Sequence, residues 1–192
     1  MSWIEPRPDR AHPWHVRLLL AVLARRGARS GSVRLWARAP RAFLAFLRLF
    51  KAVDRGGSPL PPALRALVMV RVSQRNRCAF CVDLNGARAL ERGASPEQLA
   101  ALDHHATSPL FGAGEKAALA LADAMTAQGA AVPPEVRRAL RAAFTDDAIV
   151  ELCALVAFQD MSSRFNAALD VPAEGACAVP ARRQPASGGA GT

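Results

Sequence analysis

Apolar side chains recur along most of this chain at intervals of three and four residues. In the stretch that begins at Pro40, Phe43, Phe46, Leu47 and Phe50 fall on one face of a helix. Strand-like alternation is nearly absent, tyrosine is missing and β-branched residues are sparse. The pattern therefore predicts an all-α fold, a compact bundle of seven or eight helices.

Start and stop signals divide the chain into its expected elements. Ser95 and Gln98 have the spacing of a capping box, and Thr145 followed by two acids is typical of a helix start. Residues 27–32 are expected to form a loop. The apolar run 67–70 could be a buried strand, but the length of its periodic segment favours a helix. The expected helices cover about 14–25, 40–55, 61–77, 78–93, a short stretch from 95, 115–128, a short stretch from 133, and 146–169.

Three segments of different composition follow from this pattern. Residues 1–57 are expected to be a basic helical N-terminal arm, 58–171 the main helical domain, and 172–192 a disordered tail rich in Ala, Pro, Gly and Ser. The apolar run 18–24 is too short to span a bilayer and lacks a cleavage site. We therefore expect a cytoplasmic protein without a membrane partner.

The net charge of +9 is concentrated in the arm, which has 12 basic and three acidic side chains, whereas residues 58–192 carry 13 of each. Such a segment can attract nucleic acid or an anionic surface. Arginine outnumbers lysine 23 to 2 along the whole chain, which favours a compositional trend over a binding patch. No zinc-finger or RNA-recognition motif is present, so we expect no nucleic-acid partner.

Cys78-Ala-Phe-Cys81 places two thiols three residues apart at the expected start of a helix. Cys78, Cys81 and Asn85 share one face of that helix, and the positive end of the helix dipole favours a thiolate there. Four cysteines are too few for a disulfide-dense secreted scaffold, so the pair is interpreted as a functional dithiol in a reducing cytosol. Cys153 is expected to be a buried apolar side chain, and Cys177 an incidental thiol of the tail.

The residues around the motif resemble the carboxymuconolactone decarboxylase family, and within it the alkylhydroperoxidase D-like (AhpD-like) branch. The likeness covers roughly residues 40–170 and implies an all-α fold of the AhpD-like type that forms homo-oligomers. It rests on residues 60–68, 72–74 and 78–84, and it continues through 93–99, 108–111, 115–120 and 164–169.

The resemblance also implies a thiol-dependent peroxidase that needs no cofactor and no metal. Cys81 attacks the hydroperoxide, a sulfenic acid forms, and Cys78 resolves it to a disulfide within the helix. An external dithiol or thiol reductant then restores the pair by exchange. The expected partners are thus a hydroperoxide, a reductant and further copies of this chain.

Two positions depart from the pattern of the family's peroxidases. Those proteins relay a proton through a glutamate twelve residues before the first cysteine and a histidine four residues after the second. This chain has Ala66 and Asn85 there. Asparagine cannot take up a proton at neutral pH, and general-base assistance contributes about 10² to 10⁴ in rate. The departures put peroxide turnover by the family's route in question.

Other polar residues are candidates for a supporting role. Gln74, Asp160 and Asn166 interrupt apolar helical stretches. They either satisfy one another inside the bundle, or one of them lies beside the dithiol and orients a thiolate or peroxide. His104, next to His105, either caps a short helix or replaces the missing histidine through space.

Three functions stay open at this point. A thiol-dependent peroxidase is the first, a disulfide-exchange or redox-sensing protein with weak peroxidase activity the second, and a non-catalytic helical oligomer the third. A zinc site at Cys78 and Cys81, completed by a histidine or Cys177, is disfavoured because structural zinc normally needs two well-spaced pairs.

Overall fold

The computed structural model describes residues 2–25, 30–129 and 131–177, and within these ranges the chain is helical and contains no strand. The all-α prediction is confirmed, and residues 67–70 lie inside a helix. The described residues form α1 (Trp14–Arg25), α2 (Gly31–Trp36), α3 (Pro40–Val53), α4 (Pro62–Arg75), α5 (Ala79–Glu91), α6 (Pro96–Ala101), α7 (Ala113–Thr126), α8 (Pro134–Ala143), α9 (Asp146–Ala168) and two 3-10 helices, η1 (Asp9–Ala11) and η2 (Leu102–His104).

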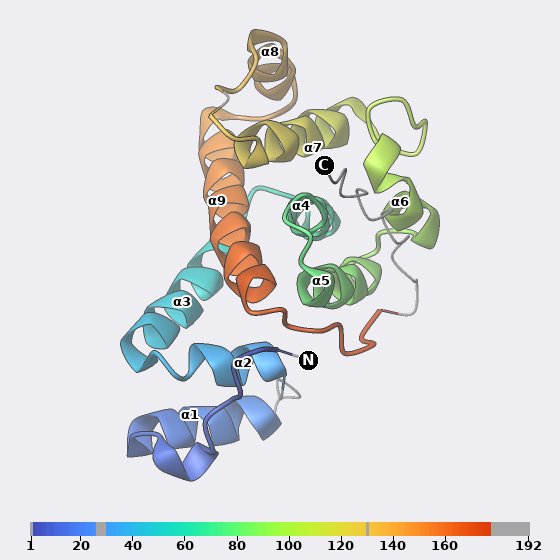
Figure 1. Ribbon diagram of the computed structural model, residues 1–192. Coiled ribbons are helices and arrows are strands. Elements are labelled where there is room, and N and C mark those ends of the chain that lie inside the picture. Colours follow the sequence, from blue (N-terminus) through green and yellow to red (C-terminus); the bar gives the residue numbers. More distant parts are fainter. Residues whose placement is uncertain (1, 26–29, 130, 178–192) are drawn as a thin grey trace.

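Helix α4 lies at the centre of the bundle, surrounded by α5, α7 and α9 (Figure 1). All residues from Leu64 to Ser73 are buried; seven of them are apolar, and the other three are Arg65, Arg71 and Ser73. Leu67, Val68 and Val72 have no exposed surface at all. The chain leaves this central helix directly into the cysteine motif, so the dithiol is anchored to the most buried element.

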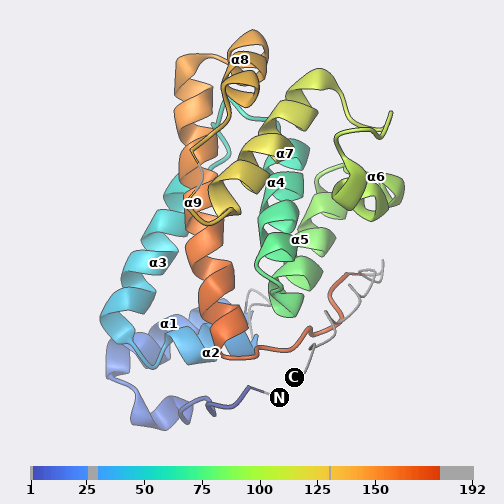
Figure 2. The same cartoon turned by 45° about the horizontal axis from the view of Figure 1, so that its top comes forward.

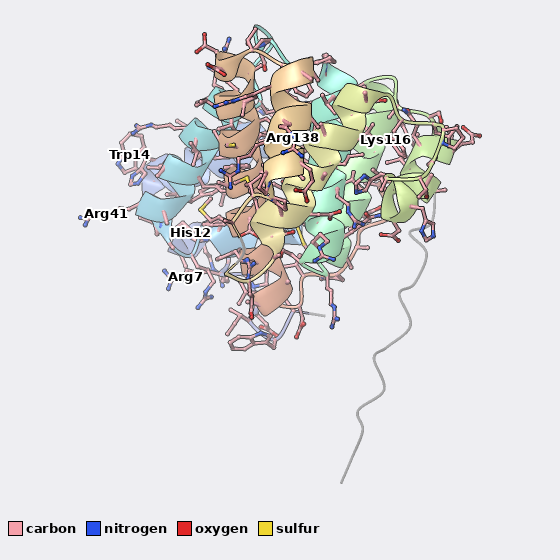
Figure 3. The ribbon with its side chains drawn as sticks, turned by 90° about the horizontal axis from the view of Figure 1, so that it is seen from above. Arg7, His12, Trp14, Arg41, Lys116 and Arg138 are labelled. Atoms are coloured by element: carbon pink, nitrogen blue, oxygen red, sulfur yellow. A yellow bond between two sulfur atoms is a disulfide. The ribbon has the colours of Figure 1, made fainter. Side chains whose placement is uncertain are left out.

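Helices α1, α2 and α3 form a layer beside the bundle, and α3 runs along α9 (Figures 1 and 2). The layer is held by stacked aromatic rings. Trp36 of α2 stacks on Phe165 of α9 with 3.8 Å between ring centroids, and Phe46 stacks on Phe158 at 5.1 Å. Basic side chains such as Arg41 point outward from this layer (Figure 3).

A buried ion pair joins the N-terminal layer to the bundle. Asp54, at the end of α3, accepts hydrogen bonds from Arg65 of α4 at 3.1 Å and from Arg92 at 2.8 and 2.9 Å. The side chains of Asp54 and Arg65 are only 2% and 4% exposed. Burial raises the pKa of Asp54, but Arg92, Arg65 and Arg88 lower it by more, so its pKa lies below the ordinary value.

The helix starts follow the capping signals of the sequence. Ser95 and Gln98 form both hydrogen bonds of a capping box, and the Thr145 side chain accepts the N–H of Ala148. The loop expected at 27–32 is wrong for residues 31 and 32, while 26–29 lie outside the described residues. The reason is a further cap: the Ser30 hydroxyl accepts the N–H of Val33 and starts α2.

The tail expected at 172–192 is described as far as Cys177. Residues 172–177 pass the beginning of α5 and are bound to it through Asp83 (Figure 1). The expected disorder of residues 178–192 concerns a part of the chain outside the described residues. No helix in the described ranges has the length and apolar character needed to cross a membrane.

Candidate active site

The cysteine motif follows a sharp turn at the end of α4. Arg77 has a φ of 53°, in the left-handed region, and the N–H of Cys78 donates to the carbonyl of Ser73 at 3.0 Å. Cys78 thereby becomes the N-cap of α5, and its sulfur accepts the N–H of Cys81 at 3.2 Å. Both sulfurs therefore lie at the positive end of the α5 dipole, as the sequence predicts.

Cys78 and Cys81 are joined as a disulfide, with 5.2 Å between their Cα atoms. This separation lies within the range of about 4.4–6.8 Å usual for disulfides. The pair can thus form its bond while both residues stay at the start of the same helix. Such a pair can store and release two electrons.

The disulfide is buried among apolar side chains. Cys78 is 1% exposed and Cys81 3% exposed. The side chains that cover the two sulfurs come from the N-terminal region, from the end of α9 with the residue Val171 that follows it, and from α5 itself. Buried beside the cysteines are Leu35, Phe80 and Val171, and the partly buried side chains packed against them are Ile4, Leu84, Phe165, Ala167 and Leu169. An apolar cover raises the free energy of a thiolate. A thiolate at this site therefore has to be stabilised by hydrogen-bond donors and by the helix dipole.

One such donor reaches the sulfur of Cys81. The Nδ2 of Asn166, near the end of α9, donates to Cys81 Sγ at 3.4 Å and to the carbonyl of Ser162 at 3.1 Å. The other end of the amide is fixed because Ser32 Oγ donates to Asn166 Oδ1 at 2.7 Å. Of the three polar residues that interrupt the apolar helices, Asn166 is therefore the one placed beside the dithiol.

A second buried network surrounds Ser73 of α4. The Ser73 hydroxyl accepts the side-chain amides of Asn85 at 3.2 Å and Gln159 at 3.0 Å, and it donates to the carbonyl of Met69 at 2.6 Å. Asn85 is only 3% exposed. The amide oxygen of Asn85 accepts from Nη1 of Arg88 at 3.4 Å. The serine, the two amides and the guanidinium of this network cannot take a proton from a thiol at neutral pH.

The contacts of the remaining candidate residues involve groups other than the two sulfurs. Gln74 accepts a hydrogen bond from Arg71 at 3.5 Å. His104 is exposed, and its backbone carbonyl accepts from Thr107 and Ser108. Cys153 is a free, half-buried thiol whose pKa is raised by burial, in keeping with a packing role.

Sequence reasoning did not single out Ser32 or Ser73. A signal for Ser73 exists, because it is a serine inside a buried run of ten residues, from Leu64 to Ser73, and such a hydroxyl needs partners. Ser32 carries no comparable signal, since its partner Asn166 is 134 residues away in the sequence.

A charged cluster lies on the other side of α4, where it borders a cavity of about 530 Å³. Arg71 pairs with Asp123 at 2.7 and 3.1 Å and with Asp103 at 2.7 Å, and His105 Nε2 lies 2.9 Å from Asp123. These groups pair with one another, and the contact with Asp123 takes up one ring nitrogen of His105 while the other, Nδ1, is buried without a hydrogen-bond partner. Among the described residues, no three His, Cys, Asp or Glu side chains are arranged to hold a metal ion.

The described helices and the cysteine pair on α5 define a protein of the AhpD-like all-α class. The sequence pattern of the carboxymuconolactone decarboxylase family matches residues 40–124, and the chain belongs to this family. It is 38% identical over 151 residues to the uncharacterized protein YnjA of Escherichia coli, across 79% of this chain and 83% of YnjA.

Solved structures have the same fold. A protein of unknown function from Agrobacterium tumefaciens, described as a candidate antioxidant-defence protein AhpD, has a TM-score of 0.67 and 28% identity, over 72% of this chain and 94% of its own. The debrominase Bmp8 has a TM-score of 0.78 and 22% identity, over 92% of this chain and 94% of its own. Proteins with this fold are thus described as having different activities. The function of this chain therefore has to be argued from its site residues.

Proposed function

We propose that this protein is a thiol-dependent peroxidase in which Cys81 reduces a hydroperoxide and Cys78 completes the disulfide. The observation that carries the proposal is the joined sulfur pair at the start of α5, with the Asn166 amide directed at Cys81. The description of the Agrobacterium tumefaciens structure as a candidate antioxidant-defence protein is in line with the same chemistry.

The proposed reaction uses these groups in two steps. The Cys81 thiolate attacks the outer oxygen of the hydroperoxide, the O–O bond breaks, and the alcohol leaves after taking up a proton. The Cys78 sulfur then attacks the sulfenic acid of Cys81, and water leaves as the disulfide forms. An external dithiol or thiol restores both cysteines by exchange. The Asn166 amide and the α5 dipole stabilise the attacking thiolate.

The composition of the network at Ser73 and Asn85 determines the rate of peroxide turnover that we expect. It contains no group that accepts a proton at neutral pH, so the thiol of Cys81 has to lose its proton to water. We expect slower turnover than in relatives with a carboxylate and imidazole relay, by a factor of about 10² to 10⁴. This observation favours disulfide exchange with weak peroxide turnover as the second candidate function, because exchange uses the same thiolate and no relay.

The first test adds one equivalent of cumene hydroperoxide to the fully reduced protein and follows free thiols against time. We expect two thiols to be lost, and the loss to be abolished in Cys81→Ser and retained in Cys153→Ser. In Cys78→Ser, one thiol should be oxidised and a sulfenic acid should accumulate. Thiols that persist as long as free cysteine does would refute the peroxidase, and rapid exchange of the disulfide with a dithiol would then support the second candidate.

The cellular setting and assembly belong to the same proposal. A dithiol that works by cycling needs a compartment that supplies reductant, so we place the protein in the cytoplasm. Homo-oligomers are expected from the family resemblance, with no nucleic-acid or membrane partner and no cofactor.

A further inference from the structure

The proposed reaction requires access to a sulfur pair that the folded chain encloses. Exposures of 1% and 3% leave Cys78 and Cys81 without a surface that a hydroperoxide or an external thiol can reach. Exchange is the more demanding step, because the attacking thiolate must approach one sulfur in direct contact. Part of the cover must therefore move in every cycle.

The cover has two parts that are held very differently. The N-terminal part includes Leu35 of α2, and α2 is fixed by the Trp36–Phe165 stack and the buried bond from Ser32 to Asn166. The C-terminal part comes from the end of α9 and from Val171, which belongs to the segment 170–177 that we name the strap. The first two residues of the strap are still tied to the end of α9, because the N–H groups of Asp170 and Val171 donate to the carbonyls of Ala167 at 3.1 Å and Asn166 at 3.0 Å. Val171 is its one fully buried apolar side chain, at 4% exposure, and residues 172–177 after it belong to no helix.

The strap is fastened to the cysteine helix by a single carboxylate. Asp83, two residues after Cys81, accepts the backbone N–H groups of Glu174 at 2.9 Å, Ala176 at 2.9 Å and Cys177 at 2.7 Å. A further bond runs from the N–H of Gly31 to the carboxylate of Glu174 at 2.7 Å. The bonds of Glu174 and Ala176 lie at the surface, where water can replace them.

The surface of α5 is shaped to receive this segment. A Cβ at position 86 would lie 2.9 Å from the sulfur of Cys177 and 3.4 Å from its Cβ, so Gly86 leaves the room that Cys177 occupies. The strap thus has a specific seat one turn after Asp83. It is the part of the cover that can detach while the aromatic stacks and the helices stay in place.

We propose that the strap is a gate: its release from Asp83 and Gly86 exposes the cysteine pair, and its docking seals it. The proposal rests on the proposed function, because it regulates access to the same dithiol. Sealing keeps water and stray thiols from a reactive pair, and opening presents the start of α5 to the reductant. The gate links reactivity to a contact more than 90 residues away in the sequence.

The test measures alkylation of the reduced protein by iodoacetamide, with the modified cysteine identified by mass spectrometry. Asp83→Ala removes the clasp, and Gly86→Leu fills the seat with a good helix former. We expect Cys81 to be alkylated at least tenfold faster in both variants. Asp147→Ala, which removes an exposed acid at the start of α9, is the matched control and should leave the rate unchanged.

Two truncations test the strap directly. A chain that ends after Pro172 lacks the strap's contacts with Asp83 and Gly86, and one that ends after Cys177 keeps them. We expect fast alkylation of Cys81 in the first and the rate of the full chain in the second. Circular dichroism and thermal unfolding must show that each variant is folded, and hydrogen exchange limited to the strap and the start of α5 is the expected signature.

The result separates the gate from the peroxidase. Alkylation uses no peroxide, so faster alkylation upholds the gate even where hydroperoxide leaves the thiols intact. Equal rates in folded Asp83→Ala, Gly86→Leu and both truncations would overturn the gate and leave the peroxidase standing. Faster alkylation only after changes in α2 would overturn it as well, because the moving part would then be the N-terminal cover.

Discussion

The side-chain amide of Asn166 lies 3.4 Å from the sulfur of Cys81, so a residue near the end of α9 donates a hydrogen bond to a cysteine at the start of α5. Ser32 holds the amide in this orientation at 2.7 Å. The contact joins three helices from distant parts of the sequence at one sulfur atom. It makes the reactivity of the cysteine depend on the packing of α2 and α9.

Replacement of Asn166 by alanine removes this donor. A hydrogen bond to a charged group contributes about 1.5–3 kcal/mol, and about 1.4 kcal/mol corresponds to one pKa unit, so we expect the Cys81 pKa to rise by about one unit or more. The pH dependence of thiolate absorbance at 240 nm measures the change. Asn76→Ala is the control, because its amide donates to Asp160 and Ser163. An unchanged Cys81 pKa in folded Asn166→Ala would show that the contact does not stabilise the thiolate.

The positions of Ala66 and Asn85 allow the family's proton relay to be rebuilt. Position 85 is buried and already directed at Ser73, and Ala66 is 1% exposed on the facing helix α4. We expect Ala66→Glu combined with Asn85→His to accelerate peroxide-dependent thiol loss by about 10²-fold, the scale of general-base assistance. Stopped-flow kinetics against Asn85→His alone gives the comparison. A folded double variant without acceleration would show that the relay does not limit this protein.

Asp54 is expected to be a determinant of stability. Its loss leaves the guanidinium of Arg65 buried without its partner, and breaking a buried pair in this way costs about 3–5 kcal/mol. We expect Asp54→Ala to lower the free energy of unfolding by about 3 kcal/mol in urea denaturation, whereas Asp147→Ala, which removes only an exposed acid from the first turn of α9, should lower it by less than about 1 kcal/mol. Because its folded pKa is depressed, this contribution is present above the ordinary pKa of 3.8 and is lost as the pH falls through the folded value. A loss below 1 kcal/mol would contradict the assignment.

The strap should respond to acid through Asp83. Burial raises the pKa of Asp83, but the N–H groups of Cys177, Ala176 and Glu174 lower it by more, so its pKa lies below the ordinary 3.8. Docking of the strap is therefore intact above pH 3.8 and weakens as the pH falls through the folded pKa. The amide resonances of Ala176 and Cys177 should shift with a midpoint below 3.8. A midpoint above 3.8 would contradict the clasp.

The sequence predicts the helices well because their signals are local. The Ser95–Gln98 box and the Thr145 cap each lie within four residues of the groups they bind. The position of the cysteine pair at a helix start is local in the same sense. The sequence does not predict α2, because this helix has only six residues and begins at a glycine, so its cap at Ser30 resembles part of a loop.

The surroundings of the sulfurs could not be derived in this way. The sequence identifies Asn166 as one of several polar residues on apolar helices. Whether Asn166 or Asp160 lies beside the cysteines depends on how α9 is rotated against α5. Ser32 and Asp83 find their partners 134 and 91–94 residues away. No pattern of residue spacing predicts such contacts, because they form only when all the helices are packed together.

The stack of Trp36 on Phe165 gives the protein a built-in optical signal. Phe165 packs against the cluster around Trp36 and also against the cluster around the cysteines. Trp36 is 7% exposed, whereas Trp3 and Trp14 are 65% and 75% exposed, so we expect its emission at shorter wavelength than theirs. Because Phe165 links the indole of Trp36 to the cluster around the cysteines, we expect the fluorescence of the unlabelled protein to change when the disulfide is reduced.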